Sequence, residues 1–221
     1  AHELRTPLTA LQLRIAHQLR AAESRGDPEE TARSKAMVDD VRRFTALVDH
    51  IVEALNIRAR GVTTARSPCD LCALARDAVA RFGARARAVG STLSLDCAAS
   101  SIVGRWDEGQ LHKVVDVLLD NAIKFGRGAP IAVSARADGR AELVVRDQGI
   151  GIADQCLPGI FDPFGRAVPR EHFGGLGLGL YTARMIVEAH GGSLTVTSRS
   201  GEGATFLVSL PLDGDTLGTR R

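Results

Sequence analysis

The sequence has no long hydrophobic run, few cysteines and aromatic residues, and almost no excess of either charge. No apolar stretch approaches the roughly 20 residues that a membrane-spanning helix needs. There are 28 Lys and Arg against 26 Asp and Glu, a net charge of +2, so charge gives no reason to expect binding to nucleic acid or to an anionic membrane. With 221 residues, 44% of them hydrophobic, the chain is typical of a globular protein with one large or two modest domains.

The cysteines argue against a disulfide-rich secreted framework, because only four are present and they are scattered: Cys69, Cys72, Cys97 and Cys156. This favours a reducing, cytoplasmic compartment. Cys69 and Cys72 form a CxxC pair, but no second pair of Cys or His lies at a spacing suited to zinc. We interpret the pair as small apolar residues at a helix start, with metal or redox use as the alternative.

The chain begins at Ala1 without an initiator Met or a signal peptide. We therefore expect a fragment of a longer protein, which leaves open a membrane anchor elsewhere.

The first sixty residues carry the heptad pattern of two long helices. Between the two patterns, SRGDPEE contains Gly26 and Pro28, which favour a tight turn. A lone pair of helices cannot bury both apolar seams, so the pattern predicts a hairpin over 1–60 that dimerises into a four-helix bundle. The apolar residues at alternating spacings of four and three are Leu4, Leu8, Leu11 and Ile15, then Met37, Val41, Phe44, Val48, Ile51 and Leu55.

The stretch HELRTPL lies at the start of the first helix. If the leucines form the buried seam, His2 and Glu3 fall on the outward side, with Thr6 one turn after His2. Pro7 lacks the amide hydrogen that would bond the Glu3 carbonyl, which loosens the backbone around His2. We expect an accessible imidazole on a helix that can bend.

A second unit follows a linker at 61–68. Its pattern over 69–212 predicts helices near 70–89, 107–125 and 177–189, short strands near 91–97 and 101–105, and two later hairpins. Residues 213–221 are polar and are expected to form a disordered tail.

Two patches of this unit carry residues suited to phosphate. LLDNAIKFG places Asn121 and Lys124 three residues apart on one helix face. An amide oxygen suits Mg²⁺, and an ammonium suits phosphate. GGLGLGL, over 174–180, frees backbone amides to surround a phosphate where a helix begins. Taken singly, these patches are also consistent with a solvated helix end and a flexible hinge.

A third patch, RDQGIGI, places Asp147 at a strand end before Gly149 and Gly151. Backbone at such glycines can approach a flat ligand, and a carboxylate can accept from an exocyclic amine. The ordinary interpretation is an Asp-Gly turn.

In this order the motifs resemble those of the sensor histidine kinases of two-component systems, over nearly the whole chain. HELRTPL is similar to the H box, LLDNAIKF to the N box, DQGIGI to the G1 box, IFDPF at 160–164 to the F box, and GGLGLGL to the G2 box. GGSLTVTSRSGEGATFLVSLP is similar to the terminal strands of the family's ATP-binding domain. The resemblance implies a fold of class α plus α/β, in which a dimeric helical hairpin precedes an α/β sandwich of the GHKL (Bergerat) type with a lid at about 152–173.

For the first domain, the resemblance implies that His2 accepts the γ-phosphoryl group of ATP, with Glu3 as the neighbouring base. It implies that Thr6 serves removal of phosphate from the partner regulator. The phosphoryl group would pass to an aspartate of a response regulator receiver domain. We expect His2 to be the only phosphorylated histidine of the six; His190, for example, ends a helix, where positive charge is favourable.

For the second domain, the resemblance implies that Asn121 holds Mg²⁺, Lys124 the phosphates and Asp147 the adenine amine. The other implied nucleotide-binding residues are Gly149, Gly151, Ile152, Gly175, Leu176, Gly177, Leu178, Gly179 and Leu180.

One departure and two alternatives accompany this interpretation. The family's N box often carries another Asn where this chain has Val117, and a valine cannot bond ribose or phosphate. The ATP-binding unit also resembles that of gyrase, the Hsp90 chaperones and the mismatch-repair ATPases, which would make the protein an ATP-driven conformational machine. A catalytically poor scaffold that binds partners through its bundle is the third possibility.

Overall fold

The computed structural model describes residues 2–62, 64–165 and 177–212, but not the side chains of residues 2–10, 12, 39, 42–43, 46–47, 49–50 and 53–60. The chain divides into two compact units, Ala1–Arg58 and Ala59–Arg221. Across the described residues, no helix combines the length and apolar character that crossing a membrane requires.

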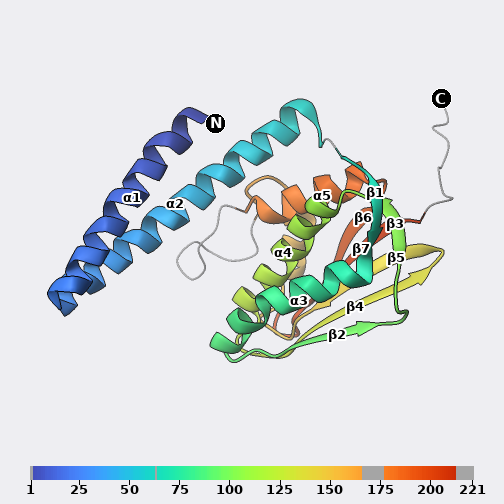
Figure 1. The fold of residues 1–221 in the computed structure, drawn as a ribbon. Helices are drawn as coiled ribbons and strands as arrows, with labels where there is room; N and C mark the ends of the chain where they lie inside the picture. Colours follow the sequence, from blue (N-terminus) through green and yellow to red (C-terminus); the bar gives the residue numbers. More distant parts are fainter. Residues whose placement is uncertain (1, 63, 166–176, 213–221) are drawn as a thin grey trace. The chain divides into compact units, whose positions relative to one another are not determined.

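The first unit is a helical hairpin. Helices α1 (His2–Arg25) and α2 (Pro28–Arg60) run antiparallel (Figure 1). Gly26 turns the chain with φ +66°, and the Asp27 Oδ1 accepts a hydrogen bond from the amide of Glu30 at 3.0 Å, which caps α2. The two predicted helices and their turn are present. Assembly of two hairpins into a four-helix bundle stays a prediction.

The hairpin leaves large apolar side chains exposed. Ile15 and Ala22 are buried, but Phe44 is 55% exposed and Met37 is 50% exposed. These two lie in the predicted seam of α2, so a single hairpin does not cover that seam. Among the described side chains of this unit, Leu11, Leu13 and Ile51 are also large, apolar and exposed.

The second unit is a layer of helices against a mixed sheet. Its helices are α3 (Leu71–Ala88), α4 (Glu108–Phe125), η1 (Asp154–Gly159, a 3₁₀ helix) and α5 (Gly179–Ala189). Its strands are β1 (Ser67–Asp70), β2 (Leu93–Cys97), β3 (Val103–Trp106), β4 (Ile131–Asp138), β5 (Arg140–Arg146), β6 (Ser193–Ser198) and β7 (Ala204–Pro211). The main sheet has the order β2-β4-β5-β7-β6, in which only β2 and β4 pair in parallel.

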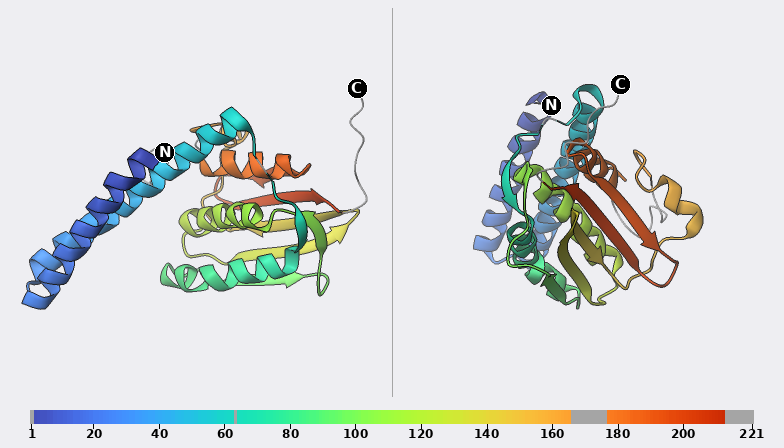
Figure 2. Two further views of the ribbon diagram at one scale, coloured as in Figure 1. Left: turned by 45° about the horizontal axis from the view of Figure 1, so that its top comes forward. Right: turned by 90° about the vertical axis from the view of Figure 1, so that its right-hand side faces the viewer.

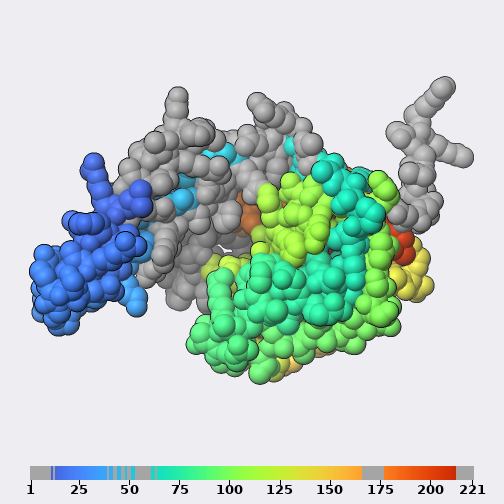
Figure 3. All heavy atoms as spheres, in the orientation of Figure 1, coloured from blue at the N-terminus to red at the C-terminus, as the bar shows by residue number. Residues whose placement is uncertain are grey.

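Alternation along the strands determines which face of the sheet is covered. On β4, Ile131, Val133 and Ala135 are buried, whereas Ala132 between them and Arg136 directly after them are exposed. Helices α3, α4 and α5 pack on the buried face (Figure 2). In the space-filling view, α3 and α4 lie next to each other on this side of the unit (Figure 3). The predicted α/β sandwich is confirmed.

A small second sheet lies at the start of this unit, where β1 pairs antiparallel with β3. Strand β1 includes Ser67 and Pro68, which fall within the stretch predicted as a linker. Trp106 ends β3 fully buried, and its indole N–H donates to the Pro211 carbonyl at 3.1 Å. Residues 67–68 therefore join the folded unit through long-range pairing that local composition does not indicate.

Candidate functional site

Helix α4 presents Asn121 and Lys124. The carboxylate of Asp107 caps the helix by accepting from the Gln110 amide at 3.0 Å. An apolar face that includes Leu118 and Leu119 is buried in the core. This packing leaves Asn121 and Lys124 half-buried, and the Lys124 ammonium lies 4.8 Å from the centre of the Phe125 ring. Both side chains are thus positioned on a rigid helix.

Asp147 lies just after β5 and is only 5% exposed. Its Oδ1 accepts from the Gly149 amide at 2.8 Å and from the Ala204 amide at 3.3 Å. Burial raises the pKa of this carboxyl, and the two backbone donors act in the opposite direction. Both bonds end on Oδ1, so they orient the carboxylate without using Oδ2.

The glycines after Asp147 allow backbone segments to pack closely. A Cβ on Gly149 would lie 2.0 Å from the Phe125 carbonyl oxygen, and one on Gly151 (φ +65°) would lie 1.9 Å from that of Arg199. The Ile152 amide, next in the chain, donates to the Ser198 hydroxyl at 2.9 Å. The close approach observed at these glycines is therefore to protein backbone, whereas the sequence had suggested approach to a ligand.

The glycine-rich loop leads into α5. Gly175 and Leu176 lie outside the described residues. Gly177 has φ +70°, which is not helical, so α5 begins at Gly179 and not at Gly177 as predicted. Leu178 precedes the helix, and no side chain caps it. Among the described residues, no side chain therefore accepts from the first amides of α5, and free amides at a helix start suit an anion.

Val117, on α4, lies next to the first residue of α5. A Cβ on Gly179 would lie 3.3 Å from Cγ1 of Val117. Asn121 is one turn further along the same face of α4. Asn121 therefore lies on the same face of α4 as Val117, which is the residue of α4 next to the start of α5. Helices α4 and α5 lie side by side in Figure 1.

The residues predicted to act in the first domain lie at the start of the helical hairpin. His2, Glu3 and Thr6 belong to α1, but their side chains lie outside the described residues.

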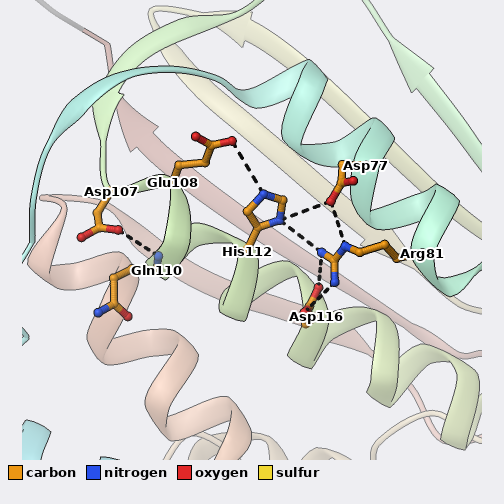
Figure 4. A network of polar contacts seen from close by, with 7 residues as sticks. All are labelled: Asp77, Arg81, Asp107, Glu108, Gln110, His112 and Asp116. Carbon is orange, nitrogen blue, oxygen red and sulfur yellow. Dashed lines mark hydrogen bonds and ion pairs between the residues drawn. The ribbon is translucent and has the colours of Figure 1, made fainter.

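His112 belongs to an ion-pair network between α3 and α4 (Figure 4). Arg81 contacts Asp77 and Asp116 at 2.8 Å each, and its Nη2 lies 3.1 Å from Nδ1 of His112. These side chains are partly exposed, so each ion pair by itself contributes little to the stability of the folded state. The network joins the two helices, and we assign His112 a structural role.

His190 carries a contact that the sequence did not indicate. It is fully buried, its Nδ1 lies 2.7 Å from the Ile186 carbonyl oxygen, and its Nε2 accepts from the Asp107 amide at 2.9 Å. Since a carbonyl cannot donate, Nδ1 carries the proton and the ring is neutral. Burial lowers the pKa of His190. The expectation of a favourable positive charge at this helix end is therefore wrong.

The segment before β1 is anchored beside His190. The amide of Ala65 donates to Asp107 Oδ2 at 2.8 Å, and the Arg66 guanidinium donates to the Ala189 carbonyl at 2.7 Å. In the sequence, Asp107 stands directly before a predicted helix. That position predicts that Asp107 caps the helix, but it does not predict a contact with the linker residue Ala65.

Comparison with known proteins gives consistent results. Residues 106–214 match the family described as histidine kinase-, DNA gyrase B-, and HSP90-like ATPase. The sensor protein SrrB of Staphylococcus aureus (strain NCTC 8325 / PS 47) is 29% identical over 216 residues, which cover 96% of this chain and 36% of SrrB. The chain thus spans about a third of the length of this curated relative.

Solved structures resemble the chain as well. Full-length ShkA in complex with AMPPNP has a TM-score of 0.81 and 25% identity, covering 95% of this chain and 44% of ShkA. The mycobacterial sensor histidine kinase MprB is 28% identical with a TM-score of 0.58, covering 66% of this chain and 97% of that structure. The Acinetobacter baumannii histidine kinase AdeS, at 21% identity and a TM-score of 0.67, covers 97% of this chain and 99% of that structure, and shares the fold. Residues 106–214 therefore carry a domain of the histidine kinase-, DNA gyrase B-, and HSP90-like ATPase family, and over nearly its whole length the chain is similar to sensor histidine kinases.

Proposed function

We propose that the chain is the catalytic part of an ATP-dependent protein histidine kinase that transfers the γ-phosphoryl group of ATP to His2. The main support is the geometry between α4 and α5. Contact between Val117 and Gly179 places Asn121 on the same side as an uncapped helix N-terminus. Phosphoryl transfer needs positioning and charge stabilisation more than covalent help, and a helix N-terminus beside polar α4 side chains suits that need.

The second unit would hold the nucleotide at two ends. Asp147 would accept from the adenine amine through Oδ2, because Oδ1 is engaged by backbone amides. Lys124 and the amides of residues 175–180 would contact the phosphates. Gly149, Gly151 and Ile152 would shape the base-binding end through the close backbone packing described above.

The donor set fits Mg²⁺ only as an ion bound together with the nucleotide. No cluster of three or more His, Cys, Asp or Glu suited to a metal occurs in the described parts of the chain. Mg²⁺ in such sites takes one or two protein ligands and substrate phosphates, so the side-chain oxygen of Asn121 is sufficient as the protein's contribution. Bound there, the ion would neutralise developing phosphate charge.

In the first unit, His2 would be the nucleophile. Free imidazole has a pKa of about 6.5, so much of it is neutral near pH 7. Glu3 would orient the ring and take its proton. The phosphoryl group would then pass to an aspartate of a response regulator, and Thr6 would position the water that later removes it.

We infer that the working unit is a homodimer. Phe44 and Met37, both at least half exposed in the α2 seam, are apolar residues that a second hairpin would cover. A four-helix bundle buries such seams between facing helices.

Labelling with radioactive γ-phosphate tests the proposal directly. The full chain, incubated with labelled ATP and Mg²⁺, is expected to gain acid-labile phosphate that His2→Gln abolishes. His17→Gln is the matched control, since His17 is an exposed histidine on the same helix, and it should keep the label. Release of free phosphate without protein labelling would favour an ATP-driven conformational machine. Absence of nucleotide binding by calorimetry would favour a scaffold.

A further inference from the structure

The chain segment that leads into β1 is attached to the second unit at two points, both beside His190. The amide of Ala65 donates to Oδ2 of Asp107 at 2.8 Å. The guanidinium of Arg66 donates at 2.7 Å to the carbonyl of Ala189, the residue directly before His190. Ala65 and Arg66 are both exposed, so hydrogen bonds rather than burial of apolar surface hold this stretch.

His190 supports one of these attachment points. Its Nε2 accepts from the Asp107 amide at 2.9 Å, and its Nδ1 donates to the Ile186 carbonyl at 2.7 Å. The ring therefore fixes the backbone of Asp107, whose side chain holds Ala65. Only a neutral ring can make both contacts, because a protonated imidazole has no acceptor nitrogen. A proton on Nε2 would set two N–H groups against each other at the point that positions Asp107.

The charged groups around the ring come from three segments. Asp107, at the start of α4, brings a carboxylate, and Arg66 brings a guanidinium. Arg140, on β5, donates at 3.1 Å to the carbonyl that directly follows His190 in the chain. Strands β6 and β7, which also pack on α5, contain no titratable side chain. Burial lowers the pKa of His190, and the charge of Arg66 acts in the same direction. The hydrogen bond to Ile186 and the carboxylate of Asp107 act against this effect.

We propose that protonation of His190 detaches residues 65 and 66 from the second unit, so that this stretch is attached at neutral pH and released in mild acid. A proton from solvent binds Nε2, and the hydrogen bond from the Asp107 amide breaks. Detachment lets water reach the charged ring, moves the Arg66 guanidinium away from it, and frees Oδ2 of Asp107 to accept from it. Each change favours the charged ring in the released state, so proton binding and detachment promote each other.

The direction of the pH effect follows from the burial of the ring. While the stretch is attached, the pKa of His190 lies below its ordinary value, and after release the pKa returns toward about 6.5. Attachment is therefore strongest above about pH 6.5 and weakens as pH falls below that value. Residues 61–66 connect α2 to β1, so release lengthens the free connection between the helical hairpin and the ATPase domain.

Amide hydrogen exchange of the full chain tests this proposal without nucleotide, so its outcome is separate from that of the kinase proposal. Exchange is followed by NMR at pH 7.5 and pH 5.5 and corrected for its intrinsic pH dependence. The protection of the Ala65 amide should be about tenfold lower at pH 5.5, the ratio for a ring that titrates near 6.5 when released and stays neutral when attached. The Leu71 amide, which donates to the Ile102 carbonyl at 2.8 Å, is the internal control and should keep its protection.

Variants assign the effect to the ring. The side-chain oxygen of His190→Gln can accept from the Asp107 amide at both pH values, so its Ala65 protection should not change with pH. His112→Gln, at the other histidine described in this unit, is the matched control and should respond as the native chain does. Arg66→Ala, at an exposed position, is an independent test if His190→Gln does not fold. It should raise the pKa of His190, measured by NMR of the ring, and an unchanged pKa would contradict the proposal.

Three further results would overturn the proposal. The first is an Ala65 amide that has no protection at pH 7.5 or the same protection at both pH values. The second is an equal loss of protection in His190→Gln. The third is a parallel loss at Leu71, which would indicate general loosening of the second unit and not detachment of one stretch.

Discussion

Replacing Asp147 by Asn removes the charge but keeps the shape of a buried side chain. The Asn amide oxygen can accept the two backbone bonds now made by Oδ1, at 2.8 and 3.3 Å. The amide NH₂ then takes the place of Oδ2 and presents a donor where the adenine amine would donate. Loss of a hydrogen bond to a charged group costs about 1.5–3 kcal/mol, so ATP affinity should fall roughly 10- to 150-fold.

Stability should change in the opposite direction. Burial raises the pKa of Asp147, so the folded state disfavours the charged carboxylate relative to the unfolded state. The stability of the native chain is therefore greater below the unfolded pKa of about 3.9 and decreases as pH rises through the folded pKa. The Asn side chain does not ionise, so Asp147→Asn does not lose stability as pH rises. At pH 7 the variant should unfold at an equal or higher temperature than the native chain.

Calorimetric titration with ATP and thermal unfolding at pH 7 measure the two effects. Asp96→Asn, at an exposed carboxylate on β2, is the matched control and should leave affinity unchanged. Equal ATP affinity in the native chain and Asp147→Asn would refute the adenine assignment. A large loss of thermal stability in Asp147→Asn would refute the interpretation of the buried charge.

Four further results are expected. Because burial lowers the folded pKa of His190, the stability of the native chain should decrease as pH falls below about 6.5. Between pH 7 and pH 5, the unfolding temperature of His190→Gln should therefore fall by less than that of the native chain. Gly151→Ala should unfold at a lower temperature than Gly139→Ala, because both have positive φ but a Cβ at Gly139 meets no atom within 4 Å; equal midpoints would contradict this. Asn121→Ala should abolish Mg²⁺-dependent labelling of the chain by ATP while the chain stays folded by circular dichroism. Thr6→Ala should leave labelling near normal and slow dephosphorylation of the regulator severalfold, and an unchanged decay rate would make Thr6 a structural residue.

Much of the architecture could be predicted from local patterns. The apolar spacing of α4 predicted a helix with Asn121 and Lys124 away from its buried face, and that helix spans Glu108–Phe125. The period of an amphipathic helix is a property of neighbouring residues, so it is readable without the fold. The order of the five motifs pointed to the histidine kinases for the same reason, since each motif is a short continuous stretch.

Contacts between distant segments could not be predicted in this way. Helix α5 begins two residues later than expected because the backbone of Gly177 adopts a positive φ. His190 is neutral because its ring reaches the Asp107 amide, 83 residues away. Neither fact has a signature in the adjacent sequence.

The sequence by itself determined which residues are candidates to bind phosphate, to accept from an amine or to carry a phosphoryl group, because residue type and short-range spacing decide which chemistry a side chain offers. Tertiary structure alone decided which atoms are available for them. Backbone amides from two separate segments occupy Oδ1 of Asp147, and the carbonyls of Phe125 and Arg199 make Gly149 and Gly151 necessary. Burial and hydrogen-bond partners depend on segments far apart in the chain, so they arise only when the sheet and its helices come together.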